Sequence, residues 1–380
     1  MAIHDFLPSR PASGTVAHTV TAGTDNRPTR RMSAGPVRKS RDDHGRKGLA
    51  QHMTIGDHLT EFGGLPAFTF PDADTDEKKK KKKNHAPVEL PAAGAVAWRL
   101  RVDSYDPEEN WGECFTRFLY AVDTAEVRAL IVGTWEEAYD TAPEEVVEAL
   151  VAAKDRLPAL RALFFGDIVM EECEISWINQ GSVAPLLEAY PDLEAFGVRG
   201  GQGLEFPPLT HKKLQTLVVE TGGLSAEVVR GIAASDLPAL THLDLWLGTS
   251  EYGGDSEVAD LAPILSGERL PALRHLALRN SENQDEVCAA LAAAPVVAGL
   301  TSLDVSMGVL TDDGAAALLS GQPLTHLEAL DMHYNYLSEA MRARLRETLE
   351  PAGVRLDLDA DDAEEDSDDD TVWRFVSVGE

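Results

Sequence analysis

A short leucine-rich phrase recurs along the chain and limits the folds available to it. LPALTHLDLWL begins at residue 237 and LPALRHLALRN at residue 270. Aligned on one apolar position, eight such phrases place these residues in register: Leu130, Leu163, Phe196, Leu217, Leu243, Leu276, Leu303 and Leu330. The seven steps from the first to the last cover 200 residues, a mean of about 29 residues a step. Self-similarity at this period indicates a repeat architecture in which each unit is one supersecondary motif.

Each repeat is predicted to hold one short strand followed by one helix. The phrases alternate apolar and other residues over about five positions, which is typical of a strand with one buried face. The segments between them have helical apolar spacing, and several begin with Ser or Asp followed by Glu in the first turn. These segments are APEEVVEALVAAKDRL, SVAPLLEAY, SAEVVRGIAAS, SEVADLAPILSG, DEVCAALAAAP and DDGAAALLSG. This alternation predicts parallel strands joined by right-handed crossovers, and the units must stack because one alone cannot bury its leucines.

The L-x-x-L-x-L spacing at this period resembles the leucine-rich repeat, and the mean length is similar to that of the ribonuclease-inhibitor type. The resemblance covers about residues 96–358 and extends to bacterial cytoplasmic leucine-rich-repeat proteins. It implies an α/β solenoid, a horseshoe with parallel strands on the concave face and helices on the convex face, but no established activity. The Asn that usually follows each strand survives at Asn280 and, less clearly, at Asn335, which predicts irregular turns elsewhere.

The N-terminal quarter of the chain lies outside the repeats. Residues 1–52 hold nine Lys/Arg against four Asp/Glu and have no sustained apolar period. This composition predicts a disordered leader or a gene start set too early, with Met53 as the true first residue. Residues 53–95 form an N-terminal region with six consecutive lysines at 78–83. Like charges at that density repel and predict a solvated loop; a patch for nucleic acid or for an acidic partner is the alternative.

Two further segments follow the repeats. The last repeat, which runs to residue 358, is longer and more charged than the others, as in a cap with a polar outer face. Nine of the twelve residues at 359–370 are acidic, which predicts disorder. Residues 371–380 are again apolar and β-prone, so we expect them to fold back on an exposed edge of the repeat domain or to dock on a partner.

Charge and cysteine content argue against several functional classes. The formal net charge is −30, which disfavours binding to nucleic acid or to an anionic membrane surface, because phosphate binding needs clustered Lys and Arg. It favours another protein with a basic or neutral surface as the partner. No apolar run approaches the roughly 18 residues of a membrane span. Three cysteines at unrelated spacings form neither a disulfide framework nor a zinc motif, so reduced thiols in the cytoplasm are the simplest interpretation.

No catalytic signature is present in the sequence. It contains no G-x-x-x-x-G-K-[ST], G-x-G-x-x-G, H-E-x-x-H or G-x-S-x-G motif. The glycine-rich GVRGGQG at 197–203 lacks the lysine and the following helix that phosphate binding needs. The eleven histidines are scattered, with none at i, i+4 spacing on a plausible metal face. The sequence therefore predicts no enzyme activity, no cofactor and no metal.

The candidate site is a set of polar side chains between the buried leucines. Because side chains alternate along a strand, residues next to the leucines point to the opposite, concave face, and parallel strands align them in rows. In the C-terminal half these rows hold His242, Asp244, Trp246, His275, Arg279, Asp304, Asp331 and His333. An exposed Trp beside Arg and carboxylates has the composition of a binding hot spot. The alternatives are a solvated sheet face whose charges pair with little functional consequence, and a hydrolytic or metal site built from Asp and His.

The leading functional hypothesis is a noncatalytic, cytoplasmic protein-interaction module that binds its partner on the concave strand face. This hypothesis rests on the resemblance and on the cluster around Trp246, Arg279 and Asp331, since a fold alone does not determine a function. An accessory or substrate-recognition subunit of a modifying enzyme is the second hypothesis. A hydrolase that uses the His/Asp cluster is the third.

Overall fold

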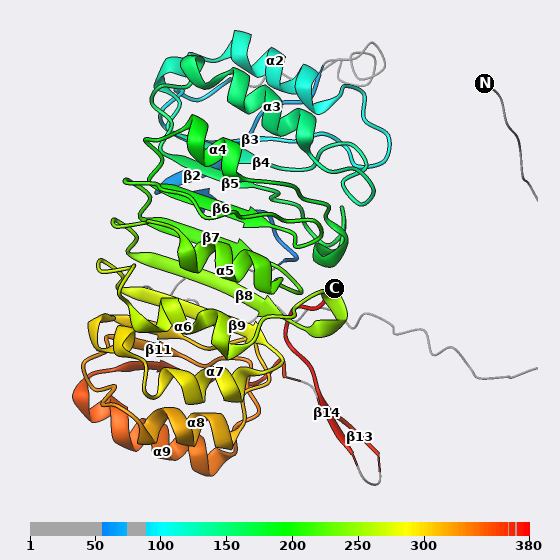
Figure 1. The fold of residues 1–380 in the computed structure, drawn as a ribbon. Helices are drawn as coiled ribbons and strands as arrows, with labels where there is room; N and C mark the ends of the chain where they lie inside the picture. The colour runs from blue at the N-terminus through cyan, green and yellow to red at the C-terminus, as the bar shows by residue number, and fades with distance from the viewer. Residues whose placement is uncertain (1–54, 74–88, 364, 369–370) are drawn as a thin grey trace, which may run out of the picture. The chain divides into compact units, whose positions relative to one another are not determined.

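The computed structural model describes residues 55–73, 89–363, 365–368 and 371–380 (Figure 1). All of them belong to one compact unit, Leu49–Glu380. The predicted leader at 1–52 and the lysines at 78–83 lie outside the described residues. None of the helices in the described segments is long and apolar enough to cross a membrane.

A long, mostly parallel sheet runs through this unit, with its strands in sequence order. Only the first pair is antiparallel, and each later neighbour pair is parallel. The strands are β1 Glu61–Phe62, β2 Leu65–Thr69, β3 Ala97–Leu100, β4 Ala129–Val132, β5 Ala162–Phe165, β6 Ala195–Arg199, β7 Thr216–Glu220, β8 His242–Gly248, β9 His275–Ser281, β10 Ser302–Asp304, β11 Ala329–Asp331 and β12 Arg355–Asp357.

The helices cover one face of this sheet (Figure 1). In the described part of the chain they are α2 Trp111–Ala121, α3 Glu144–Ala152, α4 Ala184–Ala189, α5 Ala226–Ala234, α6 Val258–Ser266, α7 Gln284–Leu291, α8 Asp312–Ser320 and α9 Glu339–Leu349. The predicted start signal at Ser225 acts as a cap, because its side chain accepts a hydrogen bond from the first turn of α5. Ser338 caps α9 in the same way. We call the opposite side of the sheet the strand face.

The sheet register confirms the predicted alignment of the repeats. Leu130 pairs with Leu163, and every later aligned residue pairs with the next in the same order. The same row continues to Trp98 at one end and Leu356 at the other. All eight aligned side chains are buried in the core between the sheet and the helices. The chain is therefore an α/β repeat in which each unit buries the same ridge against its neighbours.

The sheet begins earlier than residue 96, where the sequence places its first strand. Strand β2 pairs with β3, and β1 turns back from β2 as a hairpin over the strand face. We call the chain from residue 55 to the turn after β1 the N-terminal arm. A second apolar cluster, which includes Leu59, Ile131 and Phe164, joins this arm to the sheet. At the hairpin turn the backbone approaches so closely that a Cβ on Gly63 (φ 59°) would lie 2.5 Å from the Cβ of Ala162. The arm therefore fills the strand face of the first repeats.

The segment after the repeats contains ordered structure that its composition does not predict. Strand β13, Glu365–Ser367, pairs with β14, Val372–Arg374, as an antiparallel hairpin. The acidic residues of β13 were expected to be disordered, but the β-prone residues of β14 supply a hydrogen-bonding partner. Arg374 also donates from Nε to Glu365 Oε1 at 2.7 Å. Beyond β14 the chain folds back on its own repeats, although onto loops and not onto the sheet edge.

Candidate functional site

The structure brings the eight predicted site residues together on neighbouring strands. In the register of β8 and β9, His242 lies beside His275, and Trp246 lies beside Arg279. Asp304 and Asp331 are partners in the register of β10 and β11. Side chains that share a row on parallel strands are about 5 Å apart. The predicted rows are therefore correct.

Arg279 is the centre of this cluster. Its guanidinium donates from Nε and Nη2 to both carboxylate oxygens of Asp244, at 3.0 and 2.6 Å, and its Nη1 lies 3.5 Å from Asp304 Oδ2. The guanidinium carbon lies 5.1 Å from the ring centroid of Trp246. Burial alone would lower the pKa of Arg279, but the two carboxylates outweigh it and raise that pKa above its ordinary value. The group is a charged, bidentate ion pair on an indole face.

The cluster is buried, whereas the sequence predicts an exposed hot spot. Trp246 is 0% exposed, Arg279 4% and Asp244 5%. The expectation of an exposed tryptophan is therefore wrong, and the Arg279 guanidinium packs over the indole ring. A role of these eight residues in binding a partner stays a prediction.

Three buried polar atoms on the same side of the sheet lack a hydrogen-bond partner within the described residues. They are Nη2 of Arg199, Oε1 of Glu220 and Nε1 of Trp246. Leaving a buried polar group unpaired costs about 1–3 kcal/mol. A water molecule or a polar ligand group would therefore be stabilising in this part of the strand face.

The two predicted histidines of β8 and β9 form a stacked pair. The ring centroids of His242 and His275 are 4.0 Å apart, with 16° between the planes. Burial, the neighbouring His275 and Arg279 lower the pKa of His242 to about 3, so this ring is neutral at pH 7. His275 Nδ1 lies 2.5 Å from the hydroxyl of Ser302, a contact that a catalytic nucleophile and base would make. Within the described residues no carboxylate is hydrogen-bonded to His275, so the third group of a triad is missing.

The last two predicted site residues, Asp331 and His333, lie at the end of β11 and just beyond it. His333 Nδ1 lies 2.7 Å from Asp331 Oδ1, and the backbone N–H of His333 donates to the same oxygen at 2.9 Å. This local bond orients the imidazole along the strand end. No group of three or more His, Cys, Asp or Glu residues in the described segments is placed to hold a metal ion.

A second charge network, which the sequence did not single out, fixes the N-terminal arm. Asp167 is fully buried, and its carboxylate accepts from Arg99 Nε at 2.6 Å and from the backbone N–H of Leu59 at 3.1 Å. Arg199 lies 3.7 Å from the same carboxylate and donates to Glu220 at 2.7 Å. Positive and negative groups alternate through this network, from Arg99 to Asp167, Arg199 and Glu220, which is why they can be buried together.

His58 links this network to the arm, and its titration gives a testable result. Hydrogen bonds with Asp167 and Glu172 raise the pKa of His58 from 6.5 to about 9. A raised pKa stabilises the fold fully below pH 6.5, and that contribution is lost as pH rises through about 9. We expect His58→Gln to lower the free energy of unfolding by about 1–2 kcal/mol at pH 7, and by much less at pH 9.5. Urea unfolding at both pH values measures this; an equal loss at both would contradict it.

Four large apolar side chains are exposed on the loops that follow β3, β4 and β5. We call this set the aromatic rim: Tyr105, Tyr139, Met170 and Trp177, with 71%, 45%, 51% and 54% of each residue exposed. The rings of Tyr105 and Tyr139 are 6.3 Å apart and stacked. The Tyr105 hydroxyl donates to the Glu172 carbonyl at 3.3 Å, and the Asn179 amide to the Ala138 carbonyl at 2.8 Å. These bonds join the three loops into one surface.

The rim is also acidic. Its loops carry the carboxylates of Glu136, Glu137, Asp140, Glu171, Glu172 and Glu174. Arg101, at the end of β3, is ion-paired with Glu172 at 2.7 Å. Repeat length is the sequence signal for the long loops of the rim, because the steps from Leu130 and Leu163 are 33 residues each. The step from Leu243 is also 33 residues, whereas the other later steps are 21, 26 and 27 residues.

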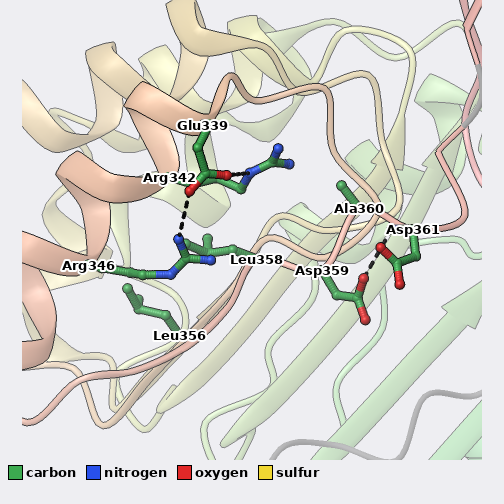
Figure 2. A pocket seen from close by; sticks show the side chains of 8 residues that line it. All are labelled: Glu339, Arg342, Arg346, Leu356, Leu358, Asp359, Ala360 and Asp361. Carbon is green, nitrogen blue, oxygen red and sulfur yellow. Dashed lines mark hydrogen bonds and ion pairs between the residues drawn. The ribbon is translucent and has the colours of Figure 1, made fainter.

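A pocket of about 460 Å³ lies at the other end of the sheet, beside α9 and β12 (Figure 2). Its walls are Glu339, Arg342, Arg346, Leu356, Leu358, Asp359, Ala360 and Asp361. Figure 2 shows the Glu339 carboxylate between the two guanidinium groups, at 3.4 Å from Arg342 and 3.5 Å from Arg346. Because the lining holds three carboxylates, Glu339, Asp359 and Asp361, against two guanidinium groups, the pocket has little attraction for an anion.

Comparison with known proteins places the fold but no activity. No family model and no curated protein matches the chain. A solved structure from Bacteroides fragilis, a structural-genomics target, is 31% identical over 66% of this chain and 70% of that chain, with a TM-score of 0.62. The chain belongs to the same family as that protein. The likeness supports an α/β repeat in both members.

Proposed function

We propose that the chain is a noncatalytic protein-interaction module of the leucine-rich-repeat type. The L-x-x-L-x-L phrases, the in-register parallel strands and the helices on the opposite face support this assignment of the repeat. Repeat proteins of this kind use surfaces formed by many neighbouring units, and here those units supply both a strand face and long strand-end loops.

The exposed aromatic rim is the observation that carries the interaction function. Tyrosine and tryptophan are enriched in binding hot spots because they bury much surface at low entropic cost. Trp177 and Tyr139 lie on loops that are joined by hydrogen bonds from Asn179 to the Ala138 carbonyl. Because these loops are already ordered, binding costs little further conformational entropy. The strand face, in contrast, is filled by the N-terminal arm in one half and by the Arg279 cluster in the other.

The chemistry of the rim favours a basic partner. Exposed carboxylates attract Lys and Arg, and the stacked rings of Tyr105 and Tyr139 offer faces for cation–π contacts. An accessory or substrate-recognition subunit of a modifying enzyme would use the same surface, and the partner would then be the enzyme or its substrate. Binding through this surface weakens as salt rises, because exposed charges are screened.

The rim can be tested by replacing two of its side chains. We expect Tyr139→Ser with Trp177→Ser to reduce the recovery of specific partners at least tenfold, since each hot-spot aromatic contributes about 2 kcal/mol or more. Quantitative co-purification from cell extract, at low and at high salt, measures this. Tyr120→Ser is the matched control, because Tyr120 is 82% exposed but lies on α2 outside the rim. Equal recovery by both variants would refute the rim as the binding surface.

A further inference from the structure

The segment after β14 lies across the loops at the ends of the later strands. Figure 1 shows it leaving the β13–β14 hairpin and reaching the end of β8. Asn280, at the end of β9, holds it by two hydrogen bonds: Nδ2 donates to the carbonyl of Val378 at 2.7 Å, and Oδ1 accepts from its amide at 3.0 Å. The Asn280 side-chain amide thus makes the same pair of hydrogen bonds to Val378 that the main chain of a neighbouring strand would make.

The loops of the other repeats also bind the main chain of this segment. The amide of Ser377 donates to the carbonyl of Met307 at 2.8 Å. The Tyr334 hydroxyl donates to the Val376 carbonyl at 3.2 Å, and the Tyr336 hydroxyl to the Phe375 carbonyl at 2.7 Å. Recognition through the backbone gives affinity for an extended chain with little demand on its sequence.

Two hydroxyl groups hold the far end of the segment. The Ser176 hydroxyl donates to the carbonyl of Gly379, and the Tyr252 hydroxyl donates to Glu380 Oε1 at 2.7 Å. The fit at Gly379 is close, because a Cβ on Gly222 would lie 2.1 Å from its carbonyl oxygen. A larger residue in either place would push the segment away.

Side chains alternate along the segment as in a bound strand. Val376 and Val378 point inward and are 8% and 5% exposed, whereas Phe375 is 53% exposed and Ser377 is also exposed. Two small β-branched residues therefore fill the loops at alternate positions. The glycine and the acidic residue that follow complete the pattern.

We propose that these strand-end loops form a peptide-binding groove, that residues 375–380 are its intramolecular ligand, and that an extended peptide with small β-branched residues at alternate positions, followed by glycine and an acidic residue, binds there in their place. A tether to the same chain keeps the internal ligand at an effective concentration on the order of 1 mM. An outside peptide binds only when it outcompetes this segment or when the segment is released. The groove uses none of the side chains of the aromatic rim, so failure of one proposal leaves the other unaffected.

The test uses the full chain and a labelled synthetic peptide covering residues 371–380. In the released variant, Val376→Asp with Val378→Asp, the internal segment no longer fits and the groove is open. Fluorescence anisotropy is expected to show binding to this variant about 100-fold tighter than to the unaltered chain, as a groove with a Kd near 10 µM gives against a 1 mM internal competitor. Adding Asn280→Ala to the released variant should weaken binding at least tenfold, and a peptide with the valines of positions 376 and 378 replaced by Asp should not bind.

Equal affinity of the released variant and the unaltered chain for the peptide would overturn the proposal. A concentration-dependent dimer of the unaltered chain, in which the segment of a second copy fills the groove, would also overturn the intramolecular assignment. If the released variant does not fold, amide hydrogen exchange in the unaltered chain and in Asn280→Ala tests the same proposal. The amides of Ser377 and Val378 should be protected in the unaltered chain, and Asn280→Ala should remove the protection at Val378; no protection in the unaltered chain would overturn the proposal.

Discussion

Replacing Arg279 by methionine is expected to lower the free energy of unfolding by about 3–5 kcal/mol. The substitution keeps much of the side-chain volume but leaves the carboxylates of Asp244 and Asp304 buried without a counter-charge. It also removes the cation that lies over the Trp246 ring. Urea unfolding followed by far-UV circular dichroism at pH 7 measures the loss.

Two controls separate the buried charge from its surroundings. The triple variant Asp244→Leu, Arg279→Met, Asp304→Leu removes Arg279 together with the two carboxylates that it pairs with. Most of the stability should then return, because buried ion pairs are often replaceable by apolar groups. Lys213→Met breaks an ion pair with Asp192 on the surface and should change stability little. If Arg279→Met unfolds at the same urea concentration as the unaltered chain, Arg279 does not neutralise the two carboxylates.

The fold was predictable wherever the same buried position recurs in each repeat, because the recurring apolar residue is visible in the sequence. Leu243, Leu276 and Leu303 recur because each must occupy the same place in a stacked core, and such a constraint is visible in one sequence. Helix α2 was not predicted, although Trp111, Phe115 and Phe118 have helical spacing, because it precedes the first clear phrase. The β1–β2 hairpin was missed for a similar reason, since it belongs to no repeat.

The candidate site was predictable as a set of rows but not as a surface. Strand alternation placed Asp244, Trp246 and Arg279 on one face correctly. Their burial depends on which side chains pack over the row, and that depends on contacts between distant parts of the chain. Asp167 was not among the predicted site residues, and the same dependence explains this, because one of its hydrogen-bond partners, the backbone N–H of Leu59, is 108 residues away.

Both halves of the strand face are occupied by the chain's own groups, and for this reason we propose the loops as the binding surface. The arm covers the apolar half, and the Arg279 cluster neutralises the polar half. What stays accessible lies at the strand ends: Trp177 and Tyr139 on the long early loops. Loops tolerate sequence change more readily than packed strands, and binding residues are concentrated on them.

Acid is expected to destabilise the fold through His242, at pH values above those that protonate most carboxylates. Burial and the charges of its neighbours hold the pKa of His242 near 3, below its ordinary value of 6.5. The pKa of His275 is lowered for the same main reason. A lowered pKa means that the folded state favours the neutral ring, so its contribution is present above pH 6.5 and is lost as pH falls toward 3.

From pH 6.5 to pH 4.5, His242 alone should therefore reduce the free energy of unfolding by about 2–3 kcal/mol, at about 1.4 kcal/mol per pH unit. His242→Gln cannot bind this proton, so its stability should change less over the same interval, and the double variant with His275→Gln should change least. Urea unfolding at pH 7.0, 5.5 and 4.5 measures the three slopes. Identical slopes in all three chains would mean that neither ring is held neutral by the fold, and the stacked pair would then have no part in the acid response.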